Sequence, residues 1–227
     1  YTVLAHPDER HVIMGGMPDY GYAGGGLVFY DRQTETAELL THEDLIPWHF
    51  TMCLAALPDG TVLGGTSTRP ANGGVKKAEN DAELYILEMD SREIIWHEEL
   101  LEGVERYDDL IVGPDGKVFG TAEGGIFFVF DPAQRAVIYQ HDLREEFGQT
   151  VYQQGPQIFV PTPDGRIFVL FRSGVAQLHP RTYDVTMVAE APNRLGNGGA
   201  YVDGRLYFGG GSHGAHLYSW EVPPLEE

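Results

Sequence analysis

The sequence predicts an all-β protein: a β-propeller with about five recognisable four-stranded blades, the last of them incomplete. Two observations lead to this prediction. A short turn motif that contains aspartate recurs five times in the 227 residues, each time between two apolar runs and ahead of a third. In addition, no window repeats its apolar residues every 3.6 positions for long enough to predict an amphipathic helix.

The recurring motif predicts the turn between the first two strands of each blade. It reads Pro-Asp-Gly at 58–60, 114–116 and 163–165, Val-Asp-Gly at 202–204, and Pro-Asp-Glu in a degraded copy at 7–9. An Asp-Gly pair between two apolar, β-prone runs is a strong short-range signal of a hairpin. The spacing of the copies averages close to the roughly 40–50 residues of a propeller blade.

The third strand of each blade is expected at 26–31, 83–90, 126–132, 174–180 and 216–222, and a fourth strand follows in the first four copies only. One four-stranded meander cannot bury both of its faces, so the copies must stack, and radial stacking gives a propeller. We expect a closing strand, or further blades, ahead of Tyr1; the alternative is a five-bladed ring whose final blade has three strands. The prediction is a single propeller domain over 1–227, with approximate blades at 1–42, 43–102, 103–145, 146–192 and 193–227.

Over nearly the whole chain, this pattern resembles the broad superfamily of quinoprotein-like, NHL-like and kelch-like propellers. The resemblance rests on the Asp-Gly turns and on third strands that end in Phe-Asp-Pro at 130–132, Tyr-Asp at 30–31 and Met-Asp at 89–90. The sequence also resembles propeller domains of bacterial polysaccharide-processing proteins. It lacks a regular Trp-Asp dipeptide, a double glycine in every blade and a repeated tryptophan-docking motif. Repeat motifs of this kind imply architecture rather than function.

The charge balance argues against two classes of partner. The chain has 34 acidic and 15 basic residues, which gives a formal net charge of −19. Binding to nucleic acid or to an anionic membrane depends on Lys and Arg that neutralise phosphate, and no basic cluster here is longer than Lys76–Lys77. We therefore predict neither nucleic acid nor a membrane as a partner, and the sequence predicts no cofactor.

Loop lengths distinguish one face of the predicted propeller, because the links from second to third strand and from blade to blade include several long ones. Long loops on a rigid scaffold often hold function. Aromatic rings stack on sugar C–H faces, while amides and guanidinium groups bind hydroxyls or carboxylates. The predicted ligand-binding residues on this face are Asp19, Tyr22, Trp48, Arg69, Arg106, Gln154, Arg194 and Asn197.

Proton-transfer groups in the same loops leave an enzyme as an alternative. A lyase that acts on uronic acids needs a base, an acid and a group that neutralises the substrate carboxylate. The residues predicted as catalytic are His49, Tyr107 and His213, with Arg69, Arg106 or Arg194 as the positive charge. A glycoside hydrolase would need two acids at a controlled separation. The histidines are scattered, so no metal site is predicted.

The residues leave three functional hypotheses open. The first is a binding domain that uses its long-loop face near the central channel for carbohydrate or another small polar ligand. The second is a carbohydrate-active enzyme, with a polysaccharide lyase favoured over a hydrolase. The third is a scaffold for a protein partner, which predicts an exposed apolar patch on the short-turn face or along the fourth strands.

Overall fold

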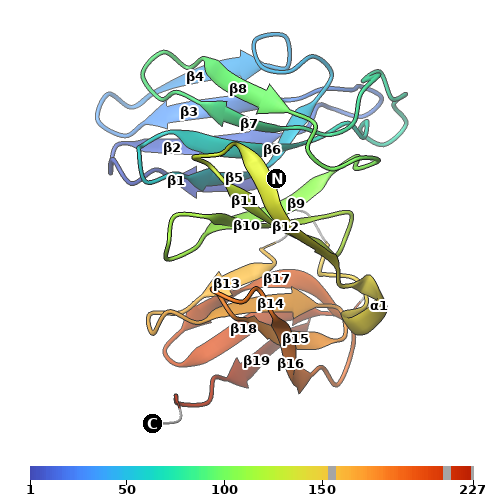
Figure 1. Ribbon diagram of the computed structural model, residues 1–227. Coiled ribbons are helices and arrows are strands. Elements are labelled where there is room, and N and C mark those ends of the chain that lie inside the picture. The colour runs from blue at the N-terminus through green and yellow to red at the C-terminus, as the bar shows by residue number, and fades with distance from the viewer. Residues whose placement is uncertain (153–156, 212–215, 226–227) are drawn as a thin grey trace. The chain divides into compact units, whose positions relative to one another are not determined.

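The computed structural model describes residues 1–152, 157–211 and 216–225 and confirms the predicted fold class. In these ranges the chain is a β-propeller with five antiparallel blades, built from 19 strands and one short helix, α1 (Arg144–Phe147) (Figure 1). Four blades have four strands and the fifth has three, in agreement with the prediction of an incomplete last blade.

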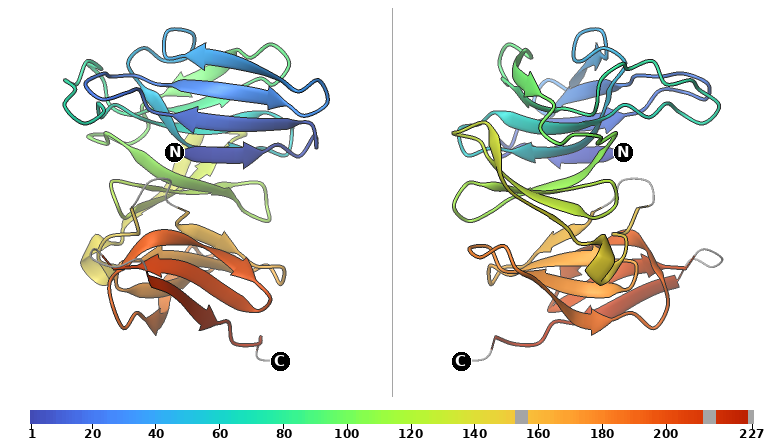
Figure 2. Two further views of the ribbon diagram at one scale, coloured as in Figure 1. Left: turned by 180° about the vertical axis from the view of Figure 1, so that it is seen from behind. Right: turned by 45° about the vertical axis from the view of Figure 1, so that its right-hand side comes forward.

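In every blade the strands pair antiparallel in the order in which they follow along the chain (Figure 2). The first blade consists of β1 (Thr2–Ala5), β2 (His11–Gly16), β3 (Gly26–Asp31) and β4 (Thr36–Thr41). The second consists of β5 (Phe50–Ala56), β6 (Val62–Ser67), β7 (Leu84–Leu87) and β8 (Ile94–Glu98). The third consists of β9 (Tyr107–Val112), β10 (Val118–Ala122), β11 (Ile126–Asp131) and β12 (Ala136–Asp142).

The last two blades repeat the same meander. The fourth consists of β13 (Phe159–Pro161), β14 (Ile167–Phe171), β15 (Gly174–Leu178) and β16 (Val185–Glu190), and the fifth of β17 (Leu195–Val202), β18 (Arg205–Gly210) and β19 (His216–Glu221). The chain divides into two compact units: the first is Tyr1–Glu123 with Phe128–Gln140, and the second is Gly124–Phe127 with His141–Glu227. The prediction of one domain over 1–227 stays a prediction.

The core of the first unit lies between neighbouring blades. β1 and β2 contact β5, and β5 and β6 contact β9. Ile13, Phe29 and Leu54 belong to a buried cluster that joins the first two blades. Burial of one such side chain contributes about 1.5–3 kcal/mol, so stacked blades supply the apolar burial that an isolated meander lacks. In the second unit, β13 and β14 contact β17 in the same way.

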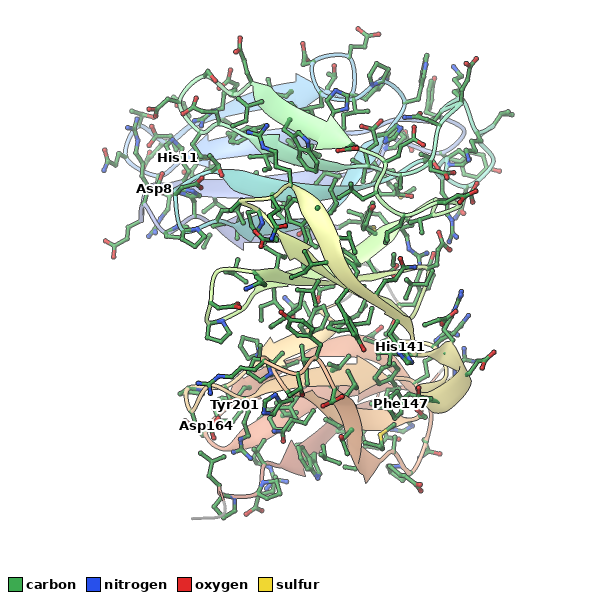
Figure 3. All side chains as sticks on the ribbon, viewed as in Figure 1. Asp8, His11, His141, Phe147, Asp164 and Tyr201 are labelled. Atoms are coloured by element: carbon green, nitrogen blue, oxygen red, sulfur yellow. The ribbon has the colours of Figure 1, made fainter. Side chains whose placement is uncertain are left out.

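In the copies of the recurring motif at 7–9, 58–60, 114–116 and 163–165, the aspartate accepts hydrogen bonds from the backbone of its own turn. The Oδ1 atoms of Asp59, Asp115 and Asp164 accept the N–H two residues further on, at 3.0, 3.3 and 3.2 Å. In the first turn, Asp8 accepts the N–H of His11 at 2.9 Å and also contacts its ring (Figure 3). These bonds explain the preference for aspartate, because its side chain fixes the turn that the two strands require.

The residue after each motif aspartate has a positive φ. In the four copies with glycine the angles are 87° at Gly60, 80° at Gly116, 86° at Gly165 and 79° at Gly204. In the degraded copy Glu9 adopts the same region with a φ of 59°. A side chain in this region crowds the backbone, at a cost of about 1–2 kcal/mol. The first turn therefore keeps the shape of the turns at 58–60, 114–116 and 163–165 in spite of its different sequence. The turn at 202–204 differs, because Asp203 also has a positive φ, of 47°.

Two local features differ from the expected pattern. Helix α1 lies in the link after β12, which the sequence predicts as a loop, and none of its residues is buried. Strand β17 begins at Leu195, inside the link expected to precede it, so Asn197 lies within the strand at an irregularity in its pairing with β18.

Candidate functional site

Two pockets in the first unit share a stacked pair of rings. The imidazole of His42 and the indole of Trp48 lie 4.7 Å apart between centroids, with an angle of 30° between their planes. His42 lines one pocket and Trp48 lines the other. Both residues belong to the link between β4 and β5, which is one of the long links that the sequence assigns to the functional face.

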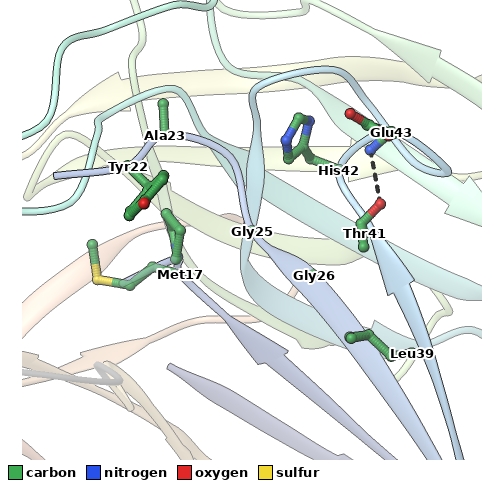
Figure 4. Close-up of a pocket in the computed structure, with 10 residues that line it drawn as sticks. Met17, Tyr22, Ala23, Gly25, Gly26, Leu39, Thr41, His42 and Glu43 are labelled. Carbon is green, nitrogen blue, oxygen red and sulfur yellow. Dashed lines mark hydrogen bonds between the residues drawn. The ribbon is translucent and has the colours of Figure 1, made fainter. Parts of the chain in front are cut away.

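The larger pocket, which we call the Tyr22 pocket, has a volume of about 490 Å³, within the usual range of small-molecule sites. Met17 and Leu39 form part of its apolar wall, and the Tyr22 ring at its edge is 67% exposed. On its polar side the Glu43 N–H donates to the Thr41 hydroxyl at 3.3 Å (Figure 4). The lining residues are Met17, Pro18, Tyr22, Ala23, Gly25, Gly26, Leu39, Thr41, His42 and Glu43.

Backbone hydrogen bonds hold the loop that contains Tyr22 against the long loop of the next blade. The Gly21 N–H donates to the Asn72 carbonyl at 2.9 Å, and the Ala71 N–H donates to the Tyr22 carbonyl at 3.0 Å. The predicted ligand residue Asp19 is exposed, and its carbonyl accepts the Tyr22 N–H at 3.2 Å. The position of Tyr22 is thus fixed from two blades, which lowers the ordering cost of binding.

Glycine allows the His42 ring to lie directly on the backbone. Gly24 has a φ of +86°, and a Cβ at this position would lie 2.3 Å from a carbon of the His42 ring. The backbone N–H of Trp48 donates to His42 Nδ1 at 3.1 Å, so the neutral imidazole has its proton on Nε2. Gly24 therefore allows both the positive φ and the close approach of the His42 ring, and in this way it positions the stacked pair of His42 and Trp48.

The second pocket, which we call the Trp48 pocket, has a volume of about 340 Å³. The Lys77 ammonium lies 4.2 Å from the centroid of the Trp48 ring. The Glu83 carboxylate, 5% exposed, accepts a hydrogen bond from Asn80 Nδ2 at 2.5 Å and contacts His97 Nδ1. The lining residues are Ile46, Pro47, Trp48, Lys77, Ala78, Glu79, Asn80, Glu83 and His97.

His49, one of the residues predicted as catalytic, connects to this pocket through Asn80. It is 3% exposed, and its Nε2 lies 3.1 Å from Asn80 Oδ1 while its Nδ1 lies 2.9 Å from the Thr66 hydroxyl. Burial is the largest cause that lowers the pKa of His49 below its ordinary value. In this structure the ring joins a chain of hydrogen bonds that continues through Glu83 to the exposed His97. A role of His49 in proton transfer stays a prediction.

Both arginines predicted in the first unit form ion pairs. Arg69 contacts Glu123, and its Nε lies 3.5 Å from Glu105 Oε2. Arg106 is 5% exposed and pairs with Asp108. The Arg69 contacts join the link after β6 to the third blade, so this side chain also connects neighbouring blades. Ligand binding by either arginine stays a prediction.

Tyr107, also predicted as catalytic, is completely buried at 0% exposure. Its ring packs edge-on against Phe128, with 5.5 Å between centroids. Its hydroxyl has no hydrogen-bond partner of ordinary geometry among the described residues. Burial is the largest cause that raises the pKa of this phenol well above its ordinary value, although an interaction with the Leu100 backbone acts to lower that pKa. Here the ring contributes to packing, and its role in proton transfer stays a prediction.

The remaining predicted residues lie in the second unit or outside the described ranges. Arg194 is exposed, and its carbonyl accepts the Gly211 N–H at 2.9 Å. Asn197 is exposed on β17. Gln154 and His213 lie outside the described residues. Within the first unit, then, the structure assigns Tyr22 to one pocket and Trp48 to the other.

Sequence reasoning did not find Lys77, Glu83 and His97 as partners in one pocket. Their proximity depends on how the link after β6 folds back, and residue spacing does not encode that path. One signal was present, since Glu83 is a charged residue at the start of an expected apolar strand. A charge at a buried position requires hydrogen-bonding partners, and the structure identifies Asn80 and His97 as those partners.

Two further observations concern only the described part of the chain. None of its His, Cys, Asp and Glu side chains gather in groups of three or more that could hold a metal ion. The chain in the same ranges contains no helix with the length and apolar character needed to cross a membrane. The single cysteine, Cys53, is buried, and desolvation raises the pKa of its thiol well above the ordinary value.

No protein-family model and no curated protein matches this sequence. Solved structures do match. The β-propeller domain of Cps50 (Swd1) from Myceliophteria thermophila is 15% identical, with a TM-score of 0.62 over 95% of this chain and 67% of that one. TolB from Acinetobacter baumannii is 14% identical, with a TM-score of 0.59 over 97% of this chain and 52% of TolB. The dihydro-heme d1 dehydrogenase NirN is 14% identical, with a TM-score of 0.60 over 98% of this chain and 44% of NirN.

At this level of identity the likeness shows the fold alone, which is the β-propeller. The chain spans about half of the length of TolB and less than half of NirN. A β-propeller is compatible with a role in binding a ligand or a protein partner.

Proposed function

We propose that this chain is a binding domain whose ligand occupies the Tyr22 pocket, and that the ligand is a carbohydrate or a similar polyhydroxylated molecule. The observation that supports this most directly is an exposed tyrosine ring at the edge of an amphipathic pocket of about 490 Å³. Sites for small ligands combine apolar walls with a few polar groups that fix the orientation of the ligand. The Tyr22 pocket has both.

The chemistry of the lining suits a sugar ring. The Tyr22 ring is available to stack on C–H groups, because its loop is held by backbone bonds while the side chain itself is 67% exposed. Met17 and Leu39 extend the apolar contact. The Nε2–H of His42 is a donor and the Glu43 carboxylate an acceptor, and sugar hydroxyls can satisfy both.

Titration calorimetry with neutral and acidic oligosaccharides tests this proposal. We expect Tyr22→Ala to weaken binding about two- to twelvefold, since aromatic contacts contribute about 0.5–1.5 kcal/mol beyond area burial. Tyr20→Ala is the matched control, because Tyr20 is 73% exposed on the same loop but does not line the pocket. Absence of binding, or equal losses in the two variants, would exclude the Tyr22 pocket as the site.

The other functional hypotheses stay predictions. Each fourth strand presents one large exposed apolar side chain, which suits a scaffold, but single exposed side chains are ordinary on protein surfaces. These side chains are Leu39, Ile95, Ile138 and Val188, exposed by 61%, 47%, 39% and 41%. The lyase and hydrolase hypotheses, and the resemblance to polysaccharide-processing propellers, also stay predictions.

A further inference from the structure

The Trp48 pocket already contains a cation. The Lys77 ammonium lies 4.2 Å from the centroid of the Trp48 ring, within the distance at which a cation and an aromatic face attract each other. Lys77 is exposed and belongs to the long link after β6. A lysine side chain at an exposed position loses rotamer freedom when it is held, so this internal cation can be displaced.

The backbone holds the indole in a conformation that a large side chain rarely adopts. Trp48 has a φ of +67°, a region that costs a bulky residue about 1–2 kcal/mol. Strained residues persist where their surroundings fix them, and they concentrate at functional sites. At Trp48 these surroundings are the His42 ring and the buried His49, which is the next residue in the chain. The His42 ring stacks on the indole and accepts a hydrogen bond from the backbone N–H of Trp48.

The rest of the pocket also suits a cation with an alkyl stem. Glu83 and Glu79 supply carboxylates, and Glu83 is held in place by Asn80 and His97. Ile46, Pro47 and Ala78 are apolar lining residues. An ammonium on an aliphatic chain needs an aromatic face, negative charge and an apolar wall for its stem. All three are present, and the net charge of −19 attracts cations from a distance.

We propose that the Trp48 pocket binds the alkylammonium group of a ligand, which displaces the Lys77 ammonium from the face of the indole. Lys77 then acts as an internal competitor that sets the affinity of the site. The proposal is independent of carbohydrate binding, because it uses a different pocket and a different ligand chemistry. The alkylammonium can belong to a small amine or to a lysine side chain of a peptide.

The test measures binding of n-butylammonium by the indole N–H signal of Trp48 in NMR spectra, with sodium chloride as a reference at the same ionic strength. Lys77→Met removes the competing charge and keeps the length of the side chain. We expect it to raise the affinity about two- to fivefold, the equivalent of a cation–π contact at an exposed site. N-acetyl-lysine methylamide, used in parallel, distinguishes the two sources: tighter binding than that of n-butylammonium indicates a peptide lysine, and weaker binding indicates a small amine.

Lys76→Met is the matched control. It removes the same charge one residue earlier, where Lys76 pairs with Glu105 at 2.7 Å and does not line the pocket. Trp48→Leu should abolish the amine-dependent shifts of NMR signals from residues around the pocket. Signals from the rest of the protein should be unchanged by this substitution, which shows that the variant is folded. Equal gains in affinity for Lys76→Met and Lys77→Met would overturn the proposal, as would the absence of any Trp48 shift in Lys77→Met beyond that caused by sodium chloride.

Discussion

Two buried tyrosines in the first unit allow a direct measurement of what a hydroxyl contributes inside this protein. Tyr85 is 1% exposed and its hydroxyl is 2.8 Å from the Thr51 hydroxyl, whereas Tyr107 is 0% exposed and its hydroxyl has no hydrogen-bond partner of ordinary geometry among the described residues. The perturbation is the removal of each hydroxyl in turn, as Tyr85→Phe and Tyr107→Phe. Both changes keep the ring, so packing against neighbours such as Phe128 is preserved.

The expected magnitudes have opposite signs. Tyr85→Phe breaks a buried hydrogen bond and leaves the Thr51 hydroxyl without it, which costs about 1–3 kcal/mol. Tyr107→Phe removes a hydroxyl that bears a desolvation cost of about 1–3 kcal/mol and has no hydrogen bond of ordinary geometry in return, only a weaker interaction with the Leu100 backbone. We therefore expect Tyr107→Phe to leave the free energy of unfolding unchanged or to raise it by about 1 kcal/mol.

Urea unfolding, with circular dichroism as the signal, measures both effects. For a chain of this size, 1 kcal/mol corresponds to a change in Tm of about 2–4 °C, so thermal melts give a second readout. The comparison requires equal m-values in the two variants. If Tyr107→Phe lost as much stability as Tyr85→Phe, the Tyr107 hydroxyl would have a bonding partner and the reasoning would be refuted.

Two more predictions concern the first two blades. Glu9→Gly should raise the free energy of unfolding by up to about 1 kcal/mol, because Glu9 has a φ of 59°. Gly60→Ala should lower it by about 1 kcal/mol, because Gly60 has a φ of 87° and there is open space around an added Cβ. Urea unfolding measures both changes, and changes of the same sign in the two variants would contradict the prediction. The second concerns pH. In the folded chain, burial lowers the pKa of His49 below its ordinary value of 6.5. Below about pH 6.5 the unfolded chain therefore binds a proton that the folded chain does not, and the stability contributed by neutral His49 is lost as pH falls. His49→Gln, which cannot titrate, should flatten the loss of Tm between pH 7 and pH 5 relative to the native protein, and an unchanged slope would show that His49 does not titrate in this range.

The fold was accessible from the sequence because it depends on local chemistry. An aspartate that accepts its own turn's N–H groups and a glycine at positive φ specify a hairpin within a few residues, and Asp59 with Gly60 illustrates both. The candidate site was accessible only in part. Tyr22 and Trp48 were predicted from their chemistry and their loops, but His42 became part of the site through contact with Gly24 and Trp48. Such contacts depend on the path of long links, which a pattern of residue types does not specify.

The turns between third and fourth strands show a repeat that residue identity conceals. In each of the four, one side chain accepts the N–H three residues further on, and the residue after that has a positive φ although it is not glycine. The accepting residues are Asp31, Glu88, Asp131 and His179, and the residues with positive φ are Glu35, Arg92, Arg135 and Tyr183. A carboxylate and an imidazole nitrogen can make the same bond. The sequence therefore varies where the physical role is constant. The Asp motif identifies the accepting residue at Asp31 and Asp131, whereas Asp90 in the second blade lies two residues after the accepting Glu88.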